Sequence, residues 1–221
     1  MTQAGKKKEE VTLKYYLGLF RKMDSVGRAK TLGVPYENDT FIVTMLGQTY
    51  QVRWPEGRIE SEDPDAFALT NGDAKLLLLR YLVVGQPLPS TGKFMTFSEL
   101  PWDDSYTGLF EKNCVQRAAN KFGRNLAGFR HAASAMGGRM LTHADASYEF
   151  TLAAGYDLRL FIWEGDDAFP PKAQILYSEN FAAGFSADGC VAAAEALIGS
   201  LYARMLTQTE VPDINPHRRW S

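Results

Sequence analysis

The apolar residues of this chain first recur with helical spacing and then alternate in short runs. From Glu9 to about Lys30 they lie between charged residues, which predicts a helix that breaks near Asp24-Ser25. Two runs rich in β-branched and aromatic residues, Thr40–Leu46 and Thr49–Trp54, flank a short turn that contains glycine. This pattern is typical of a β-hairpin.

The segment Ala74–Val84 is apolar on nearly every face, which is typical of a buried central helix. Asp73 stands where an N-cap is expected, and Gly85 where the helix stops. The following stretch, Gly85–Pro101, is rich in proline and glycine and predicts a long irregular connection.

The second half of the chain predicts helices, then strands, then one long helix. The expected elements are helices over Gly108–Phe122 and Leu126–Met136, strands over Tyr148–Leu152, Tyr156–Trp163 and Ala173–Tyr177, and a helix from Cys190 to about Leu206 capped by Asp188. We assign no structure to the proline-containing tail, residues 211–221.

A hairpin pattern followed by an apolar helix occurs twice, in residues 40–85 and 147–206. This predicts an α+β fold with two antiparallel β units, each followed by a buried helix, and a helical insertion between them. A pseudo-twofold repeat is one interpretation; the other is that any two units of this kind look alike. We expect one domain over residues 1–210.

Composition narrows the function classes. The 221 residues carry 24 Lys and Arg against 26 Asp and Glu, so a net charge of −2 does not favour nucleic acid or an anionic membrane as partner. The N-terminal lysines are followed by no apolar run of the kind a signal peptide has, so we expect a soluble, cytoplasmic protein. Cys114 and Cys190 are far apart in the sequence and are expected to be buried thiols.

The common catalytic signatures are missing from the sequence. It contains no GxxxxGK[ST], GxGxxG, HExxH, GxSxG or paired CxxC motif. This disfavours the common nucleotide triphosphatases, dinucleotide-dependent enzymes, zinc proteases and α/β-hydrolases, and leaves other enzymes open.

His143 and Asp145 form a close histidine–carboxylate pair. Residues two apart on an extended segment point to the same side, so both could address one metal ion or one proton. A metal would need a further ligand, for which Asp166 or Asp167 is a candidate if the fold brings that loop near. The alternative interpretation is a surface pair beside a loop.

The segment Gly137-Gly138-Arg139 follows a predicted helix. Consecutive glycines can present backbone N–H groups to an anion, and the arginine would add a bidentate donor. The same glycines can equally form a C-cap and a turn that need no ligand.

Two loops combine aromatic and acidic residues. The loop Trp163–Pro171 contains Asp166, Asp167 and Phe169, and its prolines stiffen it directly after an apolar strand. The loop Trp102–Tyr106 has a similar composition. Both are candidate ligand-binding loops. The alternative is that their aspartates cap backbone groups and their aromatic residues pack on the fold.

Several stretches, taken in order, resemble an uncharacterised family of bacterial and archaeal proteins, the domain of unknown function 3786. The matching segments are Leu46–Val52, Leu76–Gly92, Phe94–Leu100, Gly137-Gly138, Trp163–Pro170 and Ile175–Tyr177. The resemblance implies a link to anaerobes and to iron–sulfur or corrinoid and one-carbon metabolism. Because the cysteines are not grouped, an iron–sulfur cluster held by this chain is not expected.

Three functions follow as hypotheses. The first is a soluble accessory protein of anaerobic metabolism that binds a ligand or a partner, such as a corrinoid, through the loops at 85–100, 102–106 and 163–171. The second is a hydrolase or lyase that uses His143 and Asp145 with Asp166 or Asp167, with or without a divalent metal. The third is a homo-oligomeric scaffold, such as a homodimer. No cofactor is assigned, and whether the chain is an enzyme stays open.

Overall fold

We analysed a computed structural model of the chain, which describes residues 3–63, 72–86, 88–102 and 104–208. The helices are α1 (Gln3–Lys22), α2 (Ser25–Leu32), α4 (Gly72–Val84), α5 (Thr107–Phe110), α6 (Arg117–Phe122), α7 (Leu126–Ala135), α8 (Phe181–Gly184) and α9 (Ala187–Gln208), with short 3₁₀ turns η1 (Phe97–Glu99) and η2 (Asp104–Tyr106) and a π-helical turn η3 (Glu111–Gln116). The strands are β1 (Tyr36–Glu37), β2 (Thr40–Met45), β3 (Gln48–Arg53), β4 (Arg58–Glu60), β5 (Phe94–Thr96), β6 (Arg139–Met140), β7 (Ala146–Ala153), β8 (Tyr156–Trp163) and β9 (Lys172–Ser178).

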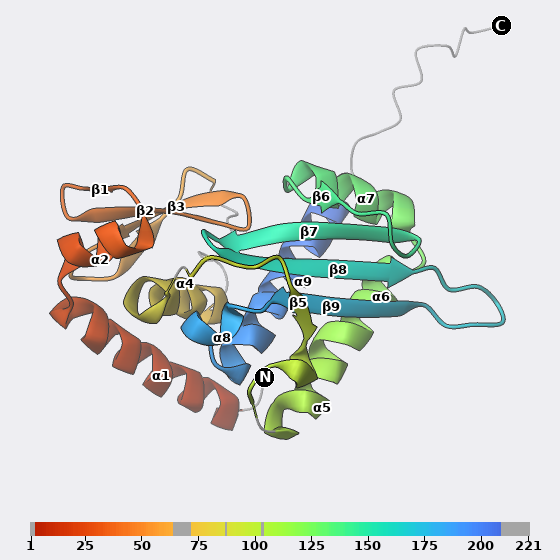
Figure 1. Ribbon diagram of the computed structural model, residues 1–221, viewed down its shortest axis with the longest axis horizontal. Coiled ribbons are helices and arrows are strands. Elements are labelled where there is room, and N and C mark those ends of the chain that lie inside the picture. Colours follow the sequence, from red (N-terminus) through yellow and green to blue (C-terminus); the bar gives the residue numbers. More distant parts are fainter. Residues whose placement is uncertain (1–2, 64–71, 87, 103, 209–221) are drawn as a thin grey trace, which may run out of the picture.

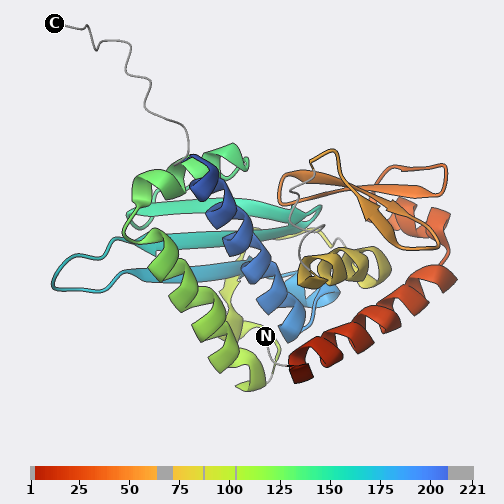
Figure 2. The same cartoon turned by 180° about the vertical axis from the view of Figure 1, so that it is seen from behind.

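The strands form two antiparallel sheets, so the predicted α+β class is confirmed. The first sheet has the strand order β1-β2-β3-β4, and the second has the order β5-β9-β8-β7-β6. Figure 1 shows the first sheet beside α1, α2 and α4, and the second sheet at the other end of the molecule. Seen from behind, α6, α7 and α9 cover one face of the second sheet (Figure 2), and no described helix lies over β7 and β8 on the face that Figure 1 shows.

One hydrophobic core runs through both sheets. Helix α4 lies between them and packs against α1 and α9, and its buried leucines belong to the same cluster as residues of β2, β7 and β8. The apolar pattern of Ala74–Val84 therefore predicts its position correctly: Leu77, Leu78 and Leu82 are fully buried. The structure starts α4 at Gly72.

The predicted helical break near Asp24-Ser25 is confirmed. Asp24 is the N-cap of α2, and its carboxylate accepts the backbone N–H of Gly27 at 3.1 Å. Helix α2 ends at Gly33, whose φ of +66° is the left-handed conformation that glycine adopts without strain.

The predicted starts of three helices were inaccurate, and one of them is α4, which contains Asp73 and is therefore not capped by it. Helix α1 begins at Gln3, well before Glu9, and α9 begins at Ala187, so Asp188 lies in its first turn and is not the cap. The Asp188 carboxylate instead accepts hydrogen bonds from Ser186 and from Arg80 of α4. Burial alone would raise the pKa of Asp188, but these bonds outweigh it and hold the pKa below its ordinary value. The tail, residues 211–221, lies outside the described residues.

Helix α9 is long and apolar enough to span a membrane by length and composition, but 61% of its most apolar window is buried inside the structure. This burial is what a core helix of a globular protein shows. The two thiols predicted to be buried, Cys114 and Cys190, are both free and fully buried.

Candidate functional site

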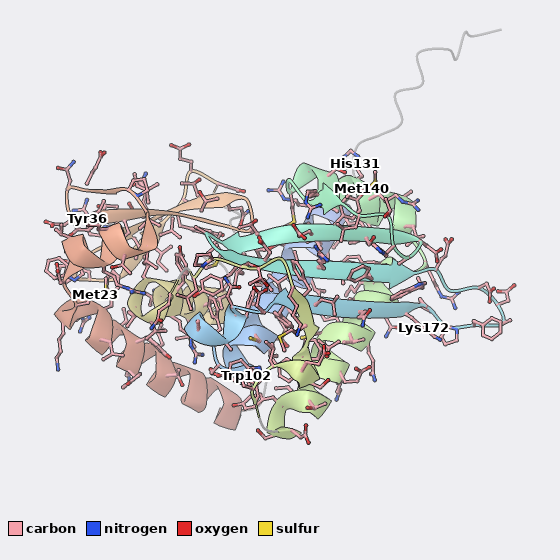
Figure 3. The ribbon with its side chains drawn as sticks, viewed as in Figure 1. Met23, Tyr36, Trp102, His131, Met140 and Lys172 are labelled. Carbon is pink, nitrogen blue, oxygen red and sulfur yellow. The ribbon has the colours of Figure 1, made fainter. Side chains whose placement is uncertain are left out.

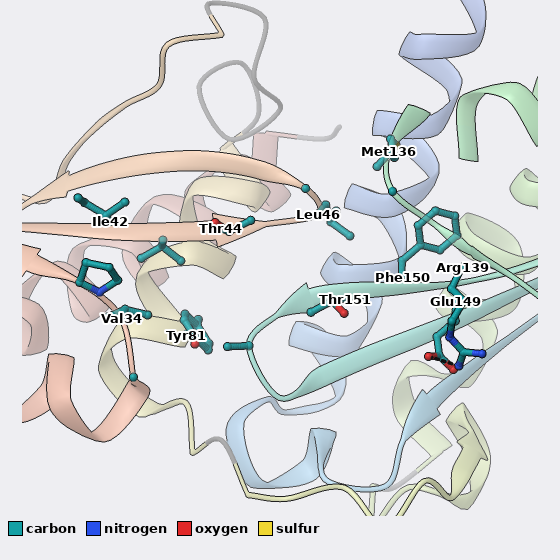
Figure 4. Close-up of a pocket in the computed structure, with 16 residues that line it drawn as sticks. Val34, Ile42, Thr44, Leu46, Tyr81, Met136, Arg139, Glu149, Phe150 and Thr151 are labelled. Carbon is teal, nitrogen blue, oxygen red and sulfur yellow. Dashed lines mark hydrogen bonds and ion pairs between the residues drawn. The ribbon is translucent and has the colours of Figure 1, made fainter. Parts of the chain in front are cut away.

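A groove of about 590 Å³ lies between the first sheet and the end of β7 (Figure 4). Its volume is within the range of small-molecule sites, roughly 300–1,000 Å³. The residues that line it come from distant parts of the chain, from the α2–β1 connection, β2, α4, the end of α7, and β6 and β7.

The groove walls are fixed by local backbone geometry. The tip of the β2–β3 hairpin has left-handed residues, Leu46 with φ of +49° and Gly47 with φ of +75°. This tip reaches the second sheet, because the backbone N–H of Leu46 donates to the carbonyl of Leu152 at 2.9 Å. A Cβ at Gly47 would lie 3.0 Å from the carbonyl oxygen of Met136, so glycine also permits the close approach to the end of α7.

Tyr81 of α4 lines the groove and has a buried hydroxyl without a hydrogen-bond partner among the described residues. Its side chain is 0% exposed. Burial raises the pKa of Tyr81 to about 12, with the neighbouring Tyr156 adding to the shift, so the group is a neutral hydroxyl at physiological pH. A buried hydroxyl without a partner costs folding free energy. Arg80, Trp102 and Ser200 also have such an atom, and Tyr81 is the one of these described residues that lines the groove.

Charged side chains gather at one end of the groove. Glu149 of β7, with a side chain 15% exposed, accepts hydrogen bonds from Arg139 of β6 at 2.5 Å and from Arg159 of β8 at 2.8 Å. The register places Glu149 directly opposite Arg159 and opposite Arg139 on the other side. Figure 4 shows the Arg139–Glu149 pair at the end of the groove away from Val34 and Ile42.

The Glu149 cluster predicts a pH dependence of stability. Burial raises the pKa of Glu149, but the hydrogen bonds from Arg139 and Arg159 outweigh it, so the pKa lies below its ordinary value. A carboxylate with a depressed folded-state pKa stabilises the fold above its unfolded pKa, about 4.3, and loses that contribution as the pH falls through the folded value.

We therefore expect the free energy of unfolding of Glu149→Gln at pH 7 to be about 1 kcal/mol lower than that of the parent. The gap should shrink as the pH falls below the unfolded-state pKa, about 4.3, and through the lower folded-state pKa of the parent carboxylate. Urea titrations of both proteins at pH 7 and at a series of pH values below 4 measure this, and a gap that does not narrow along the series would contradict a contribution from the charge of Glu149.

The predicted backbone anion site at Gly137-Gly138 is not formed. The N–H of Gly137 donates to the carbonyl of Ser134 at 3.0 Å, and that of Gly138 to Ala133 at 2.9 Å. These bonds end α7, with Gly137 left-handed at φ of +72°. Both amides are used, so only the guanidinium of Arg139 is available to an anion from this segment.

His143 and Asp145 lie in the turn between β6 and β7 and have structural contacts. The Asp145 carboxylate accepts the backbone N–H of Glu164 at 2.8 Å, which joins this turn to the start of the β8–β9 loop. The His143 ring lies edge-on to Phe161. Within the described ranges, no three His, Cys, Asp or Glu residues are placed to hold a metal ion.

The β8–β9 loop folds on itself. Asp166 accepts the backbone N–H groups of Ala168 and Phe169 at 2.8 and 2.7 Å, which lowers its pKa. Asp167 is exposed in the same loop, and Phe169 is 69% exposed. Trp163 stacks on Phe161 with ring centroids 6.3 Å apart. Asp166 thus has the capping role that was the alternative interpretation.

The two predicted aromatic loops do not meet. Trp102 and Tyr106 are partly buried against the core before α5, and Trp102 lies well away from Lys172, the strand partner of Trp163, in Figure 3. Of the predicted ligand-binding residues, Gly137 and Arg139 line the groove; Trp102, Tyr106, Gly138, Trp163, Asp166, Asp167 and Phe169 do not.

Sequence reasoning missed Tyr81 and Glu149. Tyr81 lies within an apolar helix, where nothing in the local pattern separates it from its leucine neighbours. Glu149 had no usable signal either, because a regular hairpin turning at Ala154-Gly155 would pair it with Leu160. The register shift between Thr151 and Ala153 is what places it opposite Arg159.

Comparison with known proteins supports the resemblance drawn from the sequence motifs. No functionally curated protein and no solved structure matches the chain. A family model matches residues 24–200, which include both sheets and the whole groove lining. The chain therefore belongs to the family described as "Domain of unknown function (DUF3786)".

Proposed function

We propose that this chain is a ligand-binding accessory protein and that the groove between its two sheets is the binding site. The observation that carries the proposal is the Tyr81 hydroxyl, which is buried in the groove lining without a hydrogen-bond partner among the described residues. A bound ligand that reaches past the lining side chains would give this hydroxyl an acceptor. The complex would then no longer contain an unpaired buried hydroxyl.

The anaerobic setting is part of the proposal and rests on the resemblance alone. A corrinoid is not included, because the fit is poor. The described residues that line the groove include no histidine and no cysteine, so the groove offers the cobalt neither imidazole nor thiolate. The hydrolase hypothesis has no specific support, since its four residues hold backbone turns or lie exposed and do not line the groove.

We expect protein purified without oxygen to carry a small molecule that a groove-filling substitution removes. Thr44 lies in the groove wall on β2, is exposed, and sits at a strand position that accepts tryptophan. Thr44→Trp should fill the groove at little cost to stability, and Thr44→Ser should leave the groove open.

Native mass spectrometry of the three proteins, with an absorption spectrum of each sample, measures the effect. The proposal predicts an added mass on the parent and on Thr44→Ser that is absent from Thr44→Trp. An added mass retained by Thr44→Trp would place the ligand elsewhere and contradict the proposal. Visible absorbance that follows the added mass would identify a coloured cofactor.

A further inference from the structure

The charged end of the groove holds two arginines and two carboxylates. Two guanidinium groups, Arg139 and Arg159, share the single carboxylate of Glu149. Among the described residues that line the groove, Arg139 and Glu149 are the charged ones. Asp157 accepts the hydroxyl proton of the lining residue Thr151 at 2.7 Å and adds a second carboxylate, so the charges at this end balance. An anion would therefore be recognised here by the hydrogen-bond donors of one arginine.

The two arginines are held differently. Arg159 is fixed from two sides, because its Nε donates to Glu149 and its guanidinium lies 3.6 Å from the centroid of the Phe94 ring. Arg139 stands on the two-residue edge strand β6, its side chain is 64% exposed, and its hydrogen bond to Glu149 uses one nitrogen. Of the two arginines, Arg139 therefore has guanidinium N–H groups that can bind a ligand.

An anion can recruit Arg139 without leaving a bare charge behind. If the guanidinium of Arg139 turns to an incoming carboxylate, Glu149 keeps its hydrogen bond with Arg159 and stays paired. Removing the only partner of a part-buried carboxylate would be costly, so the third member of the cluster makes the exchange feasible. A Cβ added at Gly137, next to this end, would meet no atom within 4 Å.

The opposite end of the groove is apolar. Val34, Pro35 and Ile42 form it, and Tyr81 and Thr151 lie between this end and the charged end (Figure 4). Thr151 already donates its hydroxyl proton to Asp157 at 2.7 Å. The Tyr81 hydroxyl is therefore the unpaired polar group of the described middle section, and the remaining wall there suits a hydrocarbon chain.

We propose that the groove takes an amphipathic organic monocarboxylate, with its carboxylate on Arg139 and its apolar chain toward Val34, Pro35 and Ile42. This inference rests on the proposed function above. A phosphate ester with two charges would be repelled by Glu149 and Asp157 more strongly than a carboxylate with one charge.

The test uses octanoate as the probe, with 1-octanol and octyl phosphate as probes of the same chain length. Isothermal titration calorimetry with the full chain is expected to show octanoate binding at least about tenfold more tightly than octanol. Arg139→Gln should weaken octanoate by about the same factor and leave octanol unchanged, and Arg139→Lys should recover part of the loss.

The control is Arg124→Gln, which removes an exposed arginine outside the groove lining and should bind octanoate like the parent. Octanoate that binds Arg139→Gln as tightly as the parent, octanol that binds as tightly as octanoate, tighter binding of octyl phosphate, or no octanoate binding to the parent would each overturn the carboxylate assignment. The groove itself is tested separately, because octanoate bound equally by Thr44→Trp would contradict the proposed function as well.

Discussion

Replacing Arg28 with alanine should lower the free energy of unfolding by about 2–3 kcal/mol. Arg28 lies on α2, and its guanidinium bonds the carbonyl oxygens that end α4: its Nε donates to Leu82 at 2.6 Å, and one terminal nitrogen donates to Gly85 and, at 3.4 Å, to Tyr81. The last carbonyl groups of a helix have no partner within it, and a cation there also matches the helix dipole.

Arg28 also places two walls of the groove relative to each other, because α2 leads into Val34 and α4 carries Tyr81. Arg28→Lys should lose part of the stability, since one ammonium group cannot serve carbonyls that point in different directions. Arg21→Ala, at an exposed position of α1, is the matched control. Urea denaturation of all three variants would contradict this role if Arg28→Ala stayed within 0.5 kcal/mol of the parent, the range of ordinary surface substitutions.

Removing the hydroxyl groups of Tyr156 and Tyr81 should change stability in opposite directions. Tyr156 donates its proton to the carbonyl of Gln86 at 2.6 Å and accepts the N–H of the same residue at 2.8 Å. Tyr156→Phe leaves the N–H of Gln86 without its partner, while the carbonyl keeps the N–H of Leu88 at 2.7 Å, and should cost about 1–2 kcal/mol. Tyr81→Phe leaves no described group without a partner and removes a buried one, so the unliganded protein should gain about 1–2 kcal/mol.

The two rings make this a well-matched comparison. Both are fully buried, and they contact each other edge to face with centroids 6.2 Å apart. Phenylalanine keeps the ring at either position, so packing changes little and the hydroxyl alone is tested. A stabilising substitution at a ligand-binding residue is expected, because sites often keep groups that the fold alone would not favour.

The long elements of the fold could be predicted because their patterns are strong and local. Strands β7 and β8 alternate or run apolar over eight residues each, and the glycine-containing turn between them marks the hairpin. Strands β1, β4, β5 and β6 were missed, since two or three residues hold no measurable periodicity. The π-helical turn η3 has no sequence signal at all within its predicted helix.

Helix ends that depend on distant partners also escaped prediction. The start of α9 is fixed by the contacts of Ser186 and Asp188 with Arg80, which lies more than a hundred residues earlier in the chain. The sequence around Asp188 indicates that a helix starts there. It contains no sign of the contact with Arg80.

The site was predicted in part, because the sequence motifs are local and the groove is not. Arg139 and Gly137 were found through the double glycine, although the glycine amides close the helix and bind nothing else. The loops at 102–106 and 163–171 stand out by composition, but Asp166 caps backbone groups of its own loop, and Trp102 and Tyr106 pack against the core. The groove joins residues 33–47 to residues 136–154 through the Leu46–Leu152 hydrogen bond, which no spacing in the sequence reveals.

We propose that the Tyr81 hydroxyl serves a ligand and not the fold. The most direct measurement is the free energy of unfolding of ligand-free Tyr81→Phe against the ligand-free parent, by urea denaturation at pH 7 with Tyr156→Phe alongside. The account predicts a gain of about 1–2 kcal/mol for Tyr81→Phe and a loss for Tyr156→Phe. A loss of stability in Tyr81→Phe comparable to that in Tyr156→Phe would show that the hydroxyl has a partner within the fold, and would contradict the claim.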